Sequence, residues 1–273
     1  MIQLVVLDLD NTTLTADKRI TERTVQTVRN LANRGVLFSV ATGRAFELTL
    51  PYANTLGVTI PFITNNGALI KDKDGTIHHR RTLTTTAKRD MLSHARKHGL
   101  GFTTYTEDGF YTNDTERIHV YREWNKAHPE SPVRIHEHEN TATLIGIEAY
   151  KLLMLDDDCE RFMRSYRQHE QRHDAVVIRS QDAFLDVLPP ATSKASALNV
   201  LLKQLDIDPQ HVLAFGDNDN DAAMLEYVGR GVAMPNGSDR AKTAADDIAE
   251  ADNESDGVAR TLETLMNTGV FGR

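Results

Sequence analysis

The stretch LVVLDLDNTTLT, from Leu4 to Thr15, most constrains the fold and the chemistry of this chain. An apolar run from Leu4 to Leu7 predicts a buried strand, and two aspartates one residue apart, Asp8 and Asp10, follow it. Residues i and i+2 of a strand point to one side, so both carboxylates would lie together at the strand's carboxyl end. Carboxylates this close repel unless a cation lies between them or one is protonated, and Mg²⁺ prefers such oxygen ligands. On this stretch alone, a polar loop whose aspartates cap turn amides is an equal alternative.

Short apolar runs recur along the chain and are rich in β-branched residues, which is typical of strands covered on both faces. The runs are Ile2–Leu7, Val36–Ala41, Ile60–Thr64, Phe184–Leu188, Val212–Phe215 and Gly231–Met234. Helical patterns lie between many of them, such as Leu198, Leu201, Leu202 and Leu205 on one face. This alternation predicts an α/β fold with a parallel sheet and helices on both sides.

The middle of the chain differs, because polar, aromatic and β-branched stretches alternate with helical ones from about Leu83 to Asp182. Eight of the 11 histidines lie there. Strand–helix alternation resumes afterwards, so we expect a separate α+β domain inserted into the first. A later acidic stretch, Asp246–Gly257, is expected to be a solvated surface segment.

Composition narrows the classes of function. The chain has 273 residues and a formal net charge of −8, whereas a protein that binds a nucleic-acid backbone would more often be basic. The one cysteine, Cys159, allows no internal disulfide and no Cys-based zinc site. The sequence shows neither a signal peptide nor an apolar run of about 18 residues. We therefore expect a cytoplasmic protein that binds no nucleic acid and no membrane.

Two further motifs place polar side chains after a strand and at a helix start. Thr42, Gly43 and Arg44 follow the second strand, and a hydroxyl, free amides and a guanidinium all suit a phosphoryl oxygen. By itself a Thr-Gly pair is an ordinary turn. Lys194 opens the helix that carries the leucine pattern, where a lone lysine is usually solvated surface.

The last motif is GDNDNDAAML, from Gly216 to Leu225, which follows a predicted strand. Asp217, Asp219 and Asp221 alternate there with asparagines, and aspartates so close together favour a bound cation. Calcium loops show a similar alternation, but here no Glu stands at the twelfth position and the glycine precedes the acids. A magnesium site shared with Asp8 and Asp10 is therefore preferred.

In this order, DLDNT, the TGR after the second strand, Lys194 and GDNDND resemble the four motifs of the haloacid dehalogenase (HAD) superfamily. The DxDxT form is similar to its phosphatases. The GDxxNDxxML pattern and TNNGA at Thr64–Ala68 are similar to the Cof-type, or IIB, branch. The resemblance covers essentially the whole chain. It implies a Rossmann-like parallel-sheet catalytic core at residues 1–82 and 186–273, and an inserted α+β cap for substrate specificity at residues 83–185.

The resemblance also implies a role for each matching residue. Asp8 would be the nucleophile that forms an aspartyl-phosphate. Asp10 would be the general acid and then the base, with its carbonyl on the metal, and Thr42 and Lys194 would hold phosphoryl oxygens. The implied Mg²⁺ ligands or supports are Asp8, Asp10, Asp217, Asn220 and Asp221, and the implied substrate-binding residues are Gly43, Arg44 and Asn66.

Some of these assignments keep alternatives. Arg44 could instead be a structural salt-bridge partner, and Asn66 a turn residue. Thr12 is expected to hold the loop through a hydrogen bond to the backbone. The family usually has Gly where Asn11 stands, and Asn is well tolerated there if the position needs a positive φ. Pro235 also stands where this branch commonly has Gly, which leaves the shape of that loop open.

In the inserted segment, Phe110, Tyr111 and Asn113 are candidates for facing the core, although core packing is the favoured role of the aromatics. His136 and His138 alternate along one stretch, where solvated histidines are favoured over a metal pair.

The expected function is Mg²⁺-dependent hydrolysis of small phosphomonoesters, such as sugar phosphates or similar metabolites, by a monomer or small homo-oligomer. Two alternatives stay open. A phosphomutase on the same scaffold would return an isomerised sugar phosphate rather than free phosphate. A non-catalytic, metabolite-binding regulator would show no metal-dependent turnover.

Overall fold

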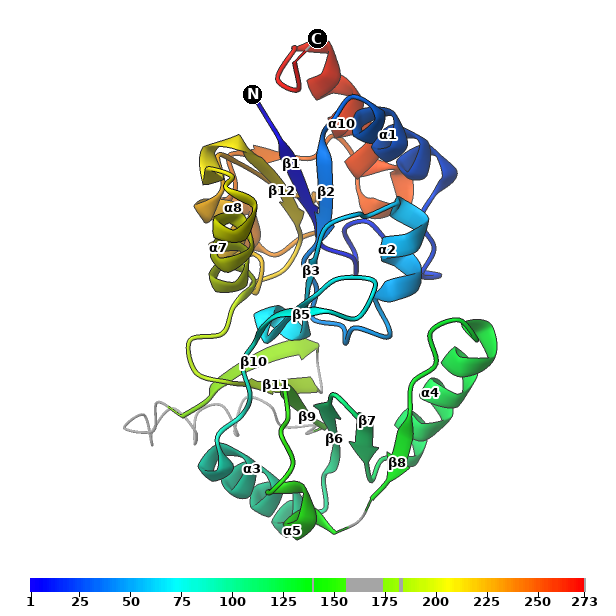
Figure 1. Ribbon diagram of the computed structural model, residues 1–273, viewed down its shortest axis with the longest axis vertical. Helices are drawn as coiled ribbons and strands as arrows, with labels where there is room; N and C mark the ends of the chain where they lie inside the picture. Colours follow the sequence, from blue (N-terminus) through cyan, green and yellow to red (C-terminus); the bar gives the residue numbers. More distant parts are fainter. Residues whose placement is uncertain (139, 156–173, 182–183, 273) are drawn as a thin grey trace. The chain divides into compact units, whose positions relative to one another are not determined.

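The computed structural model describes residues 1–138, 140–155, 174–181 and 184–272 (Figure 1). They form two compact units, which we name the core unit (Met1–His79 and Ser193–Arg273) and the inserted unit (Arg80–Thr192). The boundaries expected from the sequence, after residues 82 and 185, lie inside the inserted unit. Cys159 lies outside the described residues.

A five-stranded parallel sheet forms the centre of the core unit, in the order β14-β13-β12-β1-β2. Its strands are β1 (Leu4–Leu7), β2 (Leu37–Val40), β12 (Val212–Gly216), β13 (Arg230–Ala233) and β14 (Asp247–Ile248). β1 pairs with β2 on one side and with β12 on the other, in continuous register. All four residues of β1 are fully buried, as the unbroken apolar run predicts.

Helices cover both faces of this sheet, with α7 and α8 on one face and α1, α2 and α10 on the other (Figure 1). The helices of the core unit are α1 (Glu22–Asn33), α2 (Leu50–Leu56), α7 (Lys194–Leu205), α8 (Ala222–Tyr227), α9 (Asp239–Ala244) and α10 (Gly257–Asn267). Leu198, Leu201 and Leu202 of α7 belong to one buried apolar cluster with Leu4 and Val6 of β1. The predicted α/β fold class is confirmed.

A small second sheet consists of β3 (Phe62–Thr64), β4 (Leu69–Lys71) and β5 (Ile77–Arg80), and all of it except Arg80 lies in the core unit. β3 and β4 are antiparallel, and an isolated parallel bridge between Ala41 and Ile63 links β3 to the end of β2. The predicted strand at Ile60–Thr64 is therefore present as β3, but it contacts the parallel sheet only through this bridge and forms its ladder with β4. The short helix η1 (Asn65–Gly67) turns the chain back, so β3 pairs with the strand that follows it.

The inserted unit is built on a six-stranded sheet in the order β10-β11-β9-β6-β7-β8, in which only the described pair β7–β8 is parallel. Its strands are β6 (Gly101–Thr106), β7 (Gly109–Thr112), β8 (Ile135–Glu137), β9 (Lys151–Leu155), β10 (Val176–Gln181) and β11 (Phe184–Leu188). Its helices are α3 (Thr85–His98), α4 (Thr115–Ala127) and α5 (Thr141–Leu144). Residues of α3 and α5 share a buried apolar cluster with this sheet, including Met91, Phe102 and Leu144.

The run Phe184–Leu188 corrects a second strand assignment, because it is β11 of the inserted unit rather than a strand of the parallel sheet. Leu185 and Val187 pack into the apolar cluster, whereas Asp186 between them forms a buried ion pair with Lys151, with a nitrogen–oxygen distance of 3.2 Å. This alternation is typical of a sheet with two different faces.

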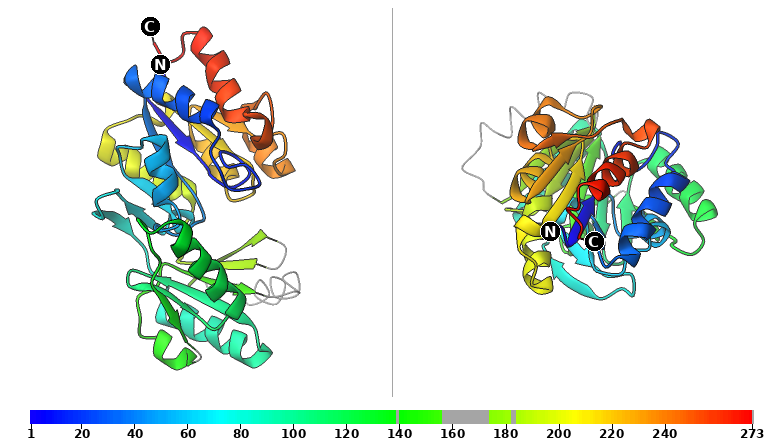
Figure 2. Two further views of the ribbon diagram at one scale, coloured as in Figure 1. Left: turned by 90° about the vertical axis from the view of Figure 1, so that its right-hand side faces the viewer. Right: turned by 90° about the horizontal axis from the view of Figure 1, so that it is seen from above.

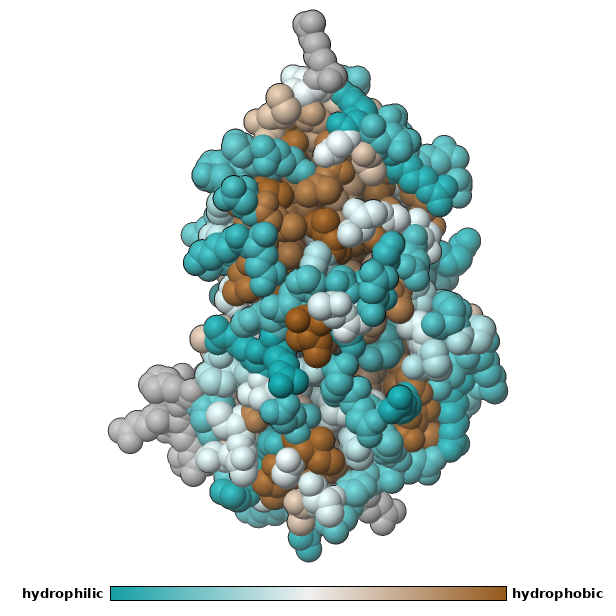
Figure 3. Space-filling model, viewed as in Figure 1, coloured by the Kyte–Doolittle hydropathy of each residue, from teal (hydrophilic) through white to brown (hydrophobic). Residues whose placement is uncertain are grey.

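The two chain ends lie side by side in the core unit (Figure 2), where the Ile2 N–H donates to the Val270 carbonyl at 2.8 Å. Hydrophilic side chains cover much of the face in Figure 3, and apolar ones gather at the level of β1, β2 and β12. Among the described residues, the large apolar side chains that are exposed are Met1, Val120 and Ile248. No helix within the described part of the chain combines the length and the apolar character that a membrane crossing requires.

Gly67 in η1 packs closely against the start of α7, and Gly35, which also has a positive φ but no close neighbour, is a matched control. A Cβ on Gly67 (φ 101°) would lie 2.3 Å from the Ser193 carbonyl oxygen, whereas nothing lies within 4 Å of one on Gly35 (φ 89°). We expect Gly67→Ala to lower the free energy of unfolding by about 3 kcal/mol and Gly35→Ala by about 1 kcal/mol. Urea unfolding of both variants measures this difference, and equal losses would contradict the close approach.

Candidate active site

The loop after β1 carries the first two candidate residues. Asp8 follows β1 directly, and its N–H donates to the Phe215 carbonyl of β12 at 3.1 Å. The next residues fold back tightly, because the N–H groups of Thr12, Thr13 and Leu14 all donate to the Leu9 carbonyl. This turn places Asn11 at φ 56°, in the left-handed region. Asn is among the few non-glycine residues that adopt this conformation readily, so the positive φ considered from the sequence is present at this position.

Two threonine hydroxyls fix this loop, but not as predicted. The Thr13 hydroxyl donates to the Asp8 carbonyl at 2.6 Å, whereas the Thr12 hydroxyl donates to the Asp217 carboxylate at 2.9 Å. The expected backbone hydrogen bond thus comes from Thr13, since Thr12 is turned toward the motif after β12. Thr12 instead ties the first and last motifs together across the sheet.

Lys194 is the centre of the buried charges. A capping box formed by Ser193 and Ser196 starts α7 at this residue, and its side chain is 1% exposed. Its Nζ lies 2.7 Å from Asp8 Oδ1 and 2.6 Å from Asp221 Oδ1. Burial lowers the pKa of an ammonium, yet the two carboxylates outweigh burial and raise the pKa of Lys194 above its ordinary value. Lys194 is therefore charged and holds Asp8 and Asp221 together.

Gly216 allows Asp221 to reach this position. A Cβ on Gly216 would lie 2.5 Å from the Asp221 Cβ, so any larger residue would displace that side chain. Asp221 Oδ2 accepts hydrogen bonds from the N–H groups of Asp217 and Asn218, each at 3.1 Å. The Asp221 carboxylate thus orders the loop that carries Asp217 as well as pairing with Lys194.

Asp8, Asp217 and Asp221 form one group, in which one carboxylate oxygen of each lies within 4.8 Å of the others. Burial raises the pKa of Asp8 well above its ordinary value, against the opposing effect of Lys194. Burial and the neighbouring Asp221 also raise the pKa of Asp217, to about 6. One lysine thus faces three buried carboxylates, and the excess negative charge in an all-oxygen donor set fits a hard divalent cation such as Mg²⁺.

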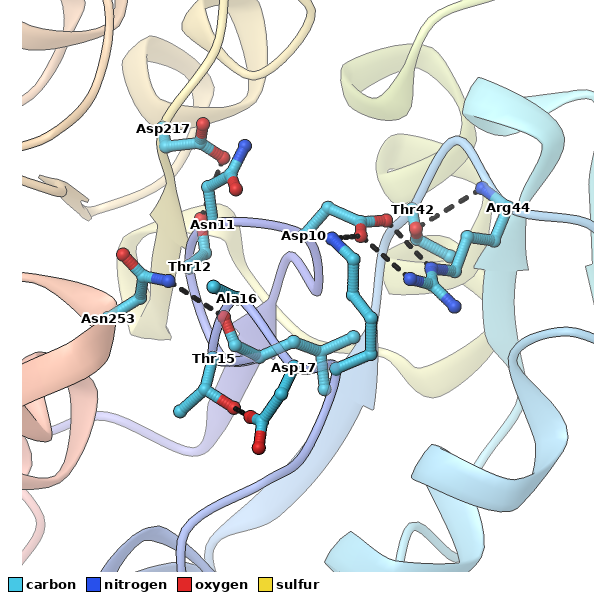
Figure 4. A network of polar contacts seen from close by, with 12 residues as sticks. Asp10, Asn11, Thr12, Thr15, Ala16, Asp17, Thr42, Arg44, Asp217 and Asn253 are labelled. Atoms are coloured by element: carbon cyan, nitrogen blue, oxygen red, sulfur yellow. Dashed lines mark hydrogen bonds and ion pairs between the residues drawn. The ribbon is translucent and has the colours of Figure 1, made fainter. Parts of the chain in front are cut away.

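Asp10 lies in a separate cluster (Figure 4). Arg44 donates to both of its oxygens, from Nε and Nη2, each at 2.7 Å, and Lys18 Nζ lies 2.8 Å from Oδ1. Partial burial raises the pKa of the Asp10 carboxyl, but Arg44 and Lys18 together hold it well below its ordinary value. Asp10 is therefore a carboxylate here. The structure shows the salt-bridge alternative for Arg44, and sequence reasoning missed Lys18.

The remaining candidates meet at the ends of β2 and β3. The Thr42 hydroxyl accepts the Arg44 N–H at 3.2 Å, and the Thr42 carbonyl accepts the Asn66 N–H at 3.0 Å. Asn66 has φ 55° and is a turn residue, but its side chain also accepts a hydrogen bond from Asn220 Nδ2 at 2.8 Å. A Cβ on Gly43 would lie only 3.1 Å from the Asn66 amide oxygen. The Asn220 amide oxygen is buried without a hydrogen-bond partner among the described residues.

The acidic stretch Asp246–Gly257 is more than a solvated surface segment. Asn253 Nδ2 donates to the Leu14 carbonyl at 2.9 Å, and Glu254 Oε1 accepts the Ala16 N–H at 2.6 Å. Neither contact was foreseen, because a distant segment that bonds to backbone carbonyls and amides leaves no pattern in the sequence.

The candidate residues of the inserted unit are Phe110, Tyr111, Asn113, His136 and His138. Phe110 is 1% exposed and packs edge-on against Tyr105 and Tyr121, so the core-packing interpretation is confirmed for it. Asn113 accepts the Phe102 N–H at 2.7 Å and so holds the start of β6. Tyr111 stacks on His136, and neither His136 nor His138 joins a metal-ligating group among the described residues.

Comparisons with known proteins agree with this geometry. The sequence model of a family described as haloacid dehalogenase-like hydrolase matches residues 5–262. Phosphatase YwpJ of Bacillus subtilis is 26% identical over 97% of this chain and all of its own length. 5-amino-6-(5-phospho-D-ribitylamino)uracil phosphatase YitU of B. subtilis is 28% identical over 97% of both chains. A haloacid dehalogenase-like hydrolase of Bacteroides thetaiotaomicron is 28% identical with a TM-score of 0.83, over 97% of this chain and all of that one.

The close approach of the three carboxylates leads to a prediction about thermal stability. Because the folded-state pKa of Asp217 is raised to about 6, its charge destabilises the metal-free fold, and this cost appears as the pH rises through that value. Near neutral pH in EDTA we expect Asp217→Asn to raise Tm by about 2–5 °C, and to abolish the further rise that Mg²⁺ gives the wild type.

Scanning calorimetry with and without Mg²⁺ measures both effects. Asp219→Asn is the matched control, since Asp219 is exposed and lies outside the carboxylate group. A lower Tm for Asp217→Asn in EDTA would contradict the electrostatic account.

Proposed function

We propose that this chain, which belongs to the haloacid dehalogenase-like hydrolases, releases phosphate from small phosphomonoesters with Mg²⁺ through an aspartyl-phosphate on Asp8. The enzyme is a phosphoric monoester hydrolase, as the named phosphatases among its relatives support. The finer proposal rests on one observation above all. Lys194 joins Asp8 to Asp221 inside a buried group of three carboxylates, which a purely structural loop would not need.

The proposed reaction has two halves. A carboxylate oxygen of Asp8 attacks phosphorus, the ester oxygen leaves, and Asp10 gives that oxygen a proton. Asp10 then takes a proton from water, and the water oxygen attacks the phosphorus of the aspartyl-phosphate. Phosphate leaves and the Asp8 carboxylate is restored. The ammonium of Lys194 and the hydroxyl of Thr42 would hold phosphoryl oxygens, and Lys194 would offset repulsion between Asp8 and the substrate dianion.

The ionisation of Asp10 suits the second half directly, because a base must begin as a carboxylate. As an acid in the first half, Asp10 needs a proton that Arg44 and Lys18 oppose in the free protein. A bound phosphate dianion counters those two cations, so substrate binding favours the protonated form. Arg44, Gly43 and Asn66 would be the substrate-side residues, and Arg44 would contact the substrate while it still holds Asp10.

The donor set fits Mg²⁺, with Asp8, Asp217 and the Asp10 carbonyl as the proposed ligands. Asp221 uses both oxygens for Lys194 and the loop amides, so it would act as a support. Asn220, whose amide oxygen lacks a partner among the described residues, completes the site. When bound, the cation would neutralise part of the charge between the nucleophile and the substrate.

The substrate class is a small phosphorylated metabolite, a sugar phosphate or a similar compound. One relative, YitU, is named for a phosphorylated ribitylaminouracil, and this name supports a small phosphorylated metabolite as the substrate class. The inserted unit would serve as the cap that sets specificity, and the core unit would be the catalytic domain. We propose a cytoplasmic enzyme that acts as a monomer or a small homo-oligomer.

Phosphate release tests this function. The wild type should release phosphate from a panel of sugar phosphates and from p-nitrophenyl phosphate in Mg²⁺ but not in EDTA. Asp8→Asn should lose at least about 10³-fold in rate, because the amide cannot act as the nucleophile.

Asp219→Asn, which removes an exposed carboxylate from the same motif, should stay within about twofold of the wild type. Isomerised sugar phosphates without free phosphate would contradict the proposal in favour of a mutase. Metabolite binding without turnover would contradict it in favour of a regulator.

A further inference from the structure

Lys18 occupies an unusual backbone position for a lysine. It has φ 60°, in the left-handed region that L side chains rarely adopt. The tight turn Thr15–Arg19 holds it there, because the Thr15 N–H donates to the Arg19 carbonyl at 3.0 Å and the Lys18 N–H donates to the Thr15 carbonyl at 2.9 Å. From this turn the side chain extends back to Asp10, with Nζ 2.8 Å from Oδ1.

A distant segment anchors the turn on both sides of Thr15. The Leu14 carbonyl accepts a hydrogen bond from Asn253 at 2.9 Å, and the Ala16 N–H donates to Glu254 at 2.6 Å. Asn253 Nδ2 also donates to Glu254 Oε1 at 3.1 Å, so the two side chains support each other. These residues come from η3 (Asn253–Ser255), which precedes α10. The position of Lys18 is therefore set by the fold and not by the loop alone.

Asp10 needs this second contact. Its side chain is 35% exposed, and Arg44 donates a hydrogen bond to each of its oxygens. With Arg44 alone, the carboxylate and guanidinium could move together, whereas Lys18 adds a hydrogen bond from a different backbone segment. Three donors on two oxygens restrict the carboxylate to one orientation. A group that transfers a proton must keep such a fixed place relative to the leaving oxygen.

We propose that Lys18 is a positioning residue for Asp10, and that Asn253 and Glu254 hold the turn that places it. The inference rests on the proposed function, since it concerns the proton that Asp10 gives to the leaving oxygen. It assigns Lys18 no contact with the phosphoryl group. Loss of Lys18 therefore impairs only those substrates whose leaving oxygen needs a proton.

The test compares two kinds of leaving group in Lys18→Gln. A sugar phosphate leaves as an alkoxide and needs the proton, whereas p-nitrophenyl phosphate leaves as a stable anion. The ratio kcat/KM reports phosphoryl transfer to Asp8 and not the later hydrolysis. We expect kcat/KM to fall about tenfold for the sugar phosphate and no more than about twofold for p-nitrophenyl phosphate. Lys18→Arg, which keeps the cation, should recover most of the loss.

Arg19→Gln is the matched control, because it removes the adjacent cation of the same turn, which pairs with Asp17 and not with Asp10. It should change kcat/KM by no more than about twofold for either substrate. Equal losses for both substrates in Lys18→Gln, or no loss for either, would overturn the proposal.

Asn253→Ala tests the anchor. It should reproduce the selective loss for the sugar phosphate, at about threefold or more, since the Leu14 carbonyl loses its donor. Unchanged selectivity in this variant would overturn the role of the anchor. A wild type that releases no phosphate from any substrate in Mg²⁺ would instead be a failure of the proposed function, so the two failures are distinguishable.

Discussion

The buried ammonium of Lys194 is the interaction on which the arrangement of the site depends. It joins Asp8, at the end of β1, to Asp221, which follows β12, and Asp221 in turn orders the amides of the loop that carries Asp217. Removing one partner of such a buried pair typically costs about 3–5 kcal/mol, because the other charge is left uncompensated. Even with Lys194 present, the site holds more negative than positive charge. A cation that fits the donor set would offset this excess and so stabilise the folded loops that carry the carboxylates.

The two aspartates of the first motif have opposite environments although they are two residues apart. Asp8 is buried beside other carboxylates, and its pKa is raised, whereas Asp10 is partly exposed beside Arg44 and Lys18, and its pKa is lowered. Such a division is how neighbouring carboxylates take different chemical roles. It arises after β1 ends at Leu7, because Asp8 lies beside Lys194 whereas Asp10 lies beside Arg44 and Lys18.

The sequence predicted the features that local pattern controls. An unbroken apolar run predicted β1, and the leucines of α7 predicted its buried face. Long-range geometry was harder to predict. Because residues i and i+2 of a strand point to one side, we expected Asp8 and Asp10 side by side, but β1 ends at Leu7 and the chain then turns. Neighbouring threonines look alike in sequence, so only the structure shows that Thr13 holds the backbone while Thr12 bonds to Asp217. The contacts of Lys18 and Asn253 likewise depend on side chains that meet across distant segments.

The central claim is that Asp8, held by Lys194, receives the phosphoryl group. The most direct measurement is to quench the enzyme in acid while it turns over p-nitrophenyl phosphate in Mg²⁺, and to locate phosphate in its peptides by mass spectrometry. The account predicts a phosphoryl group on Asp8 and none on Asp10, Asp217 or Asp221. Phosphate on another residue, or turnover with no phosphorylated peptide at any quench time, would contradict it.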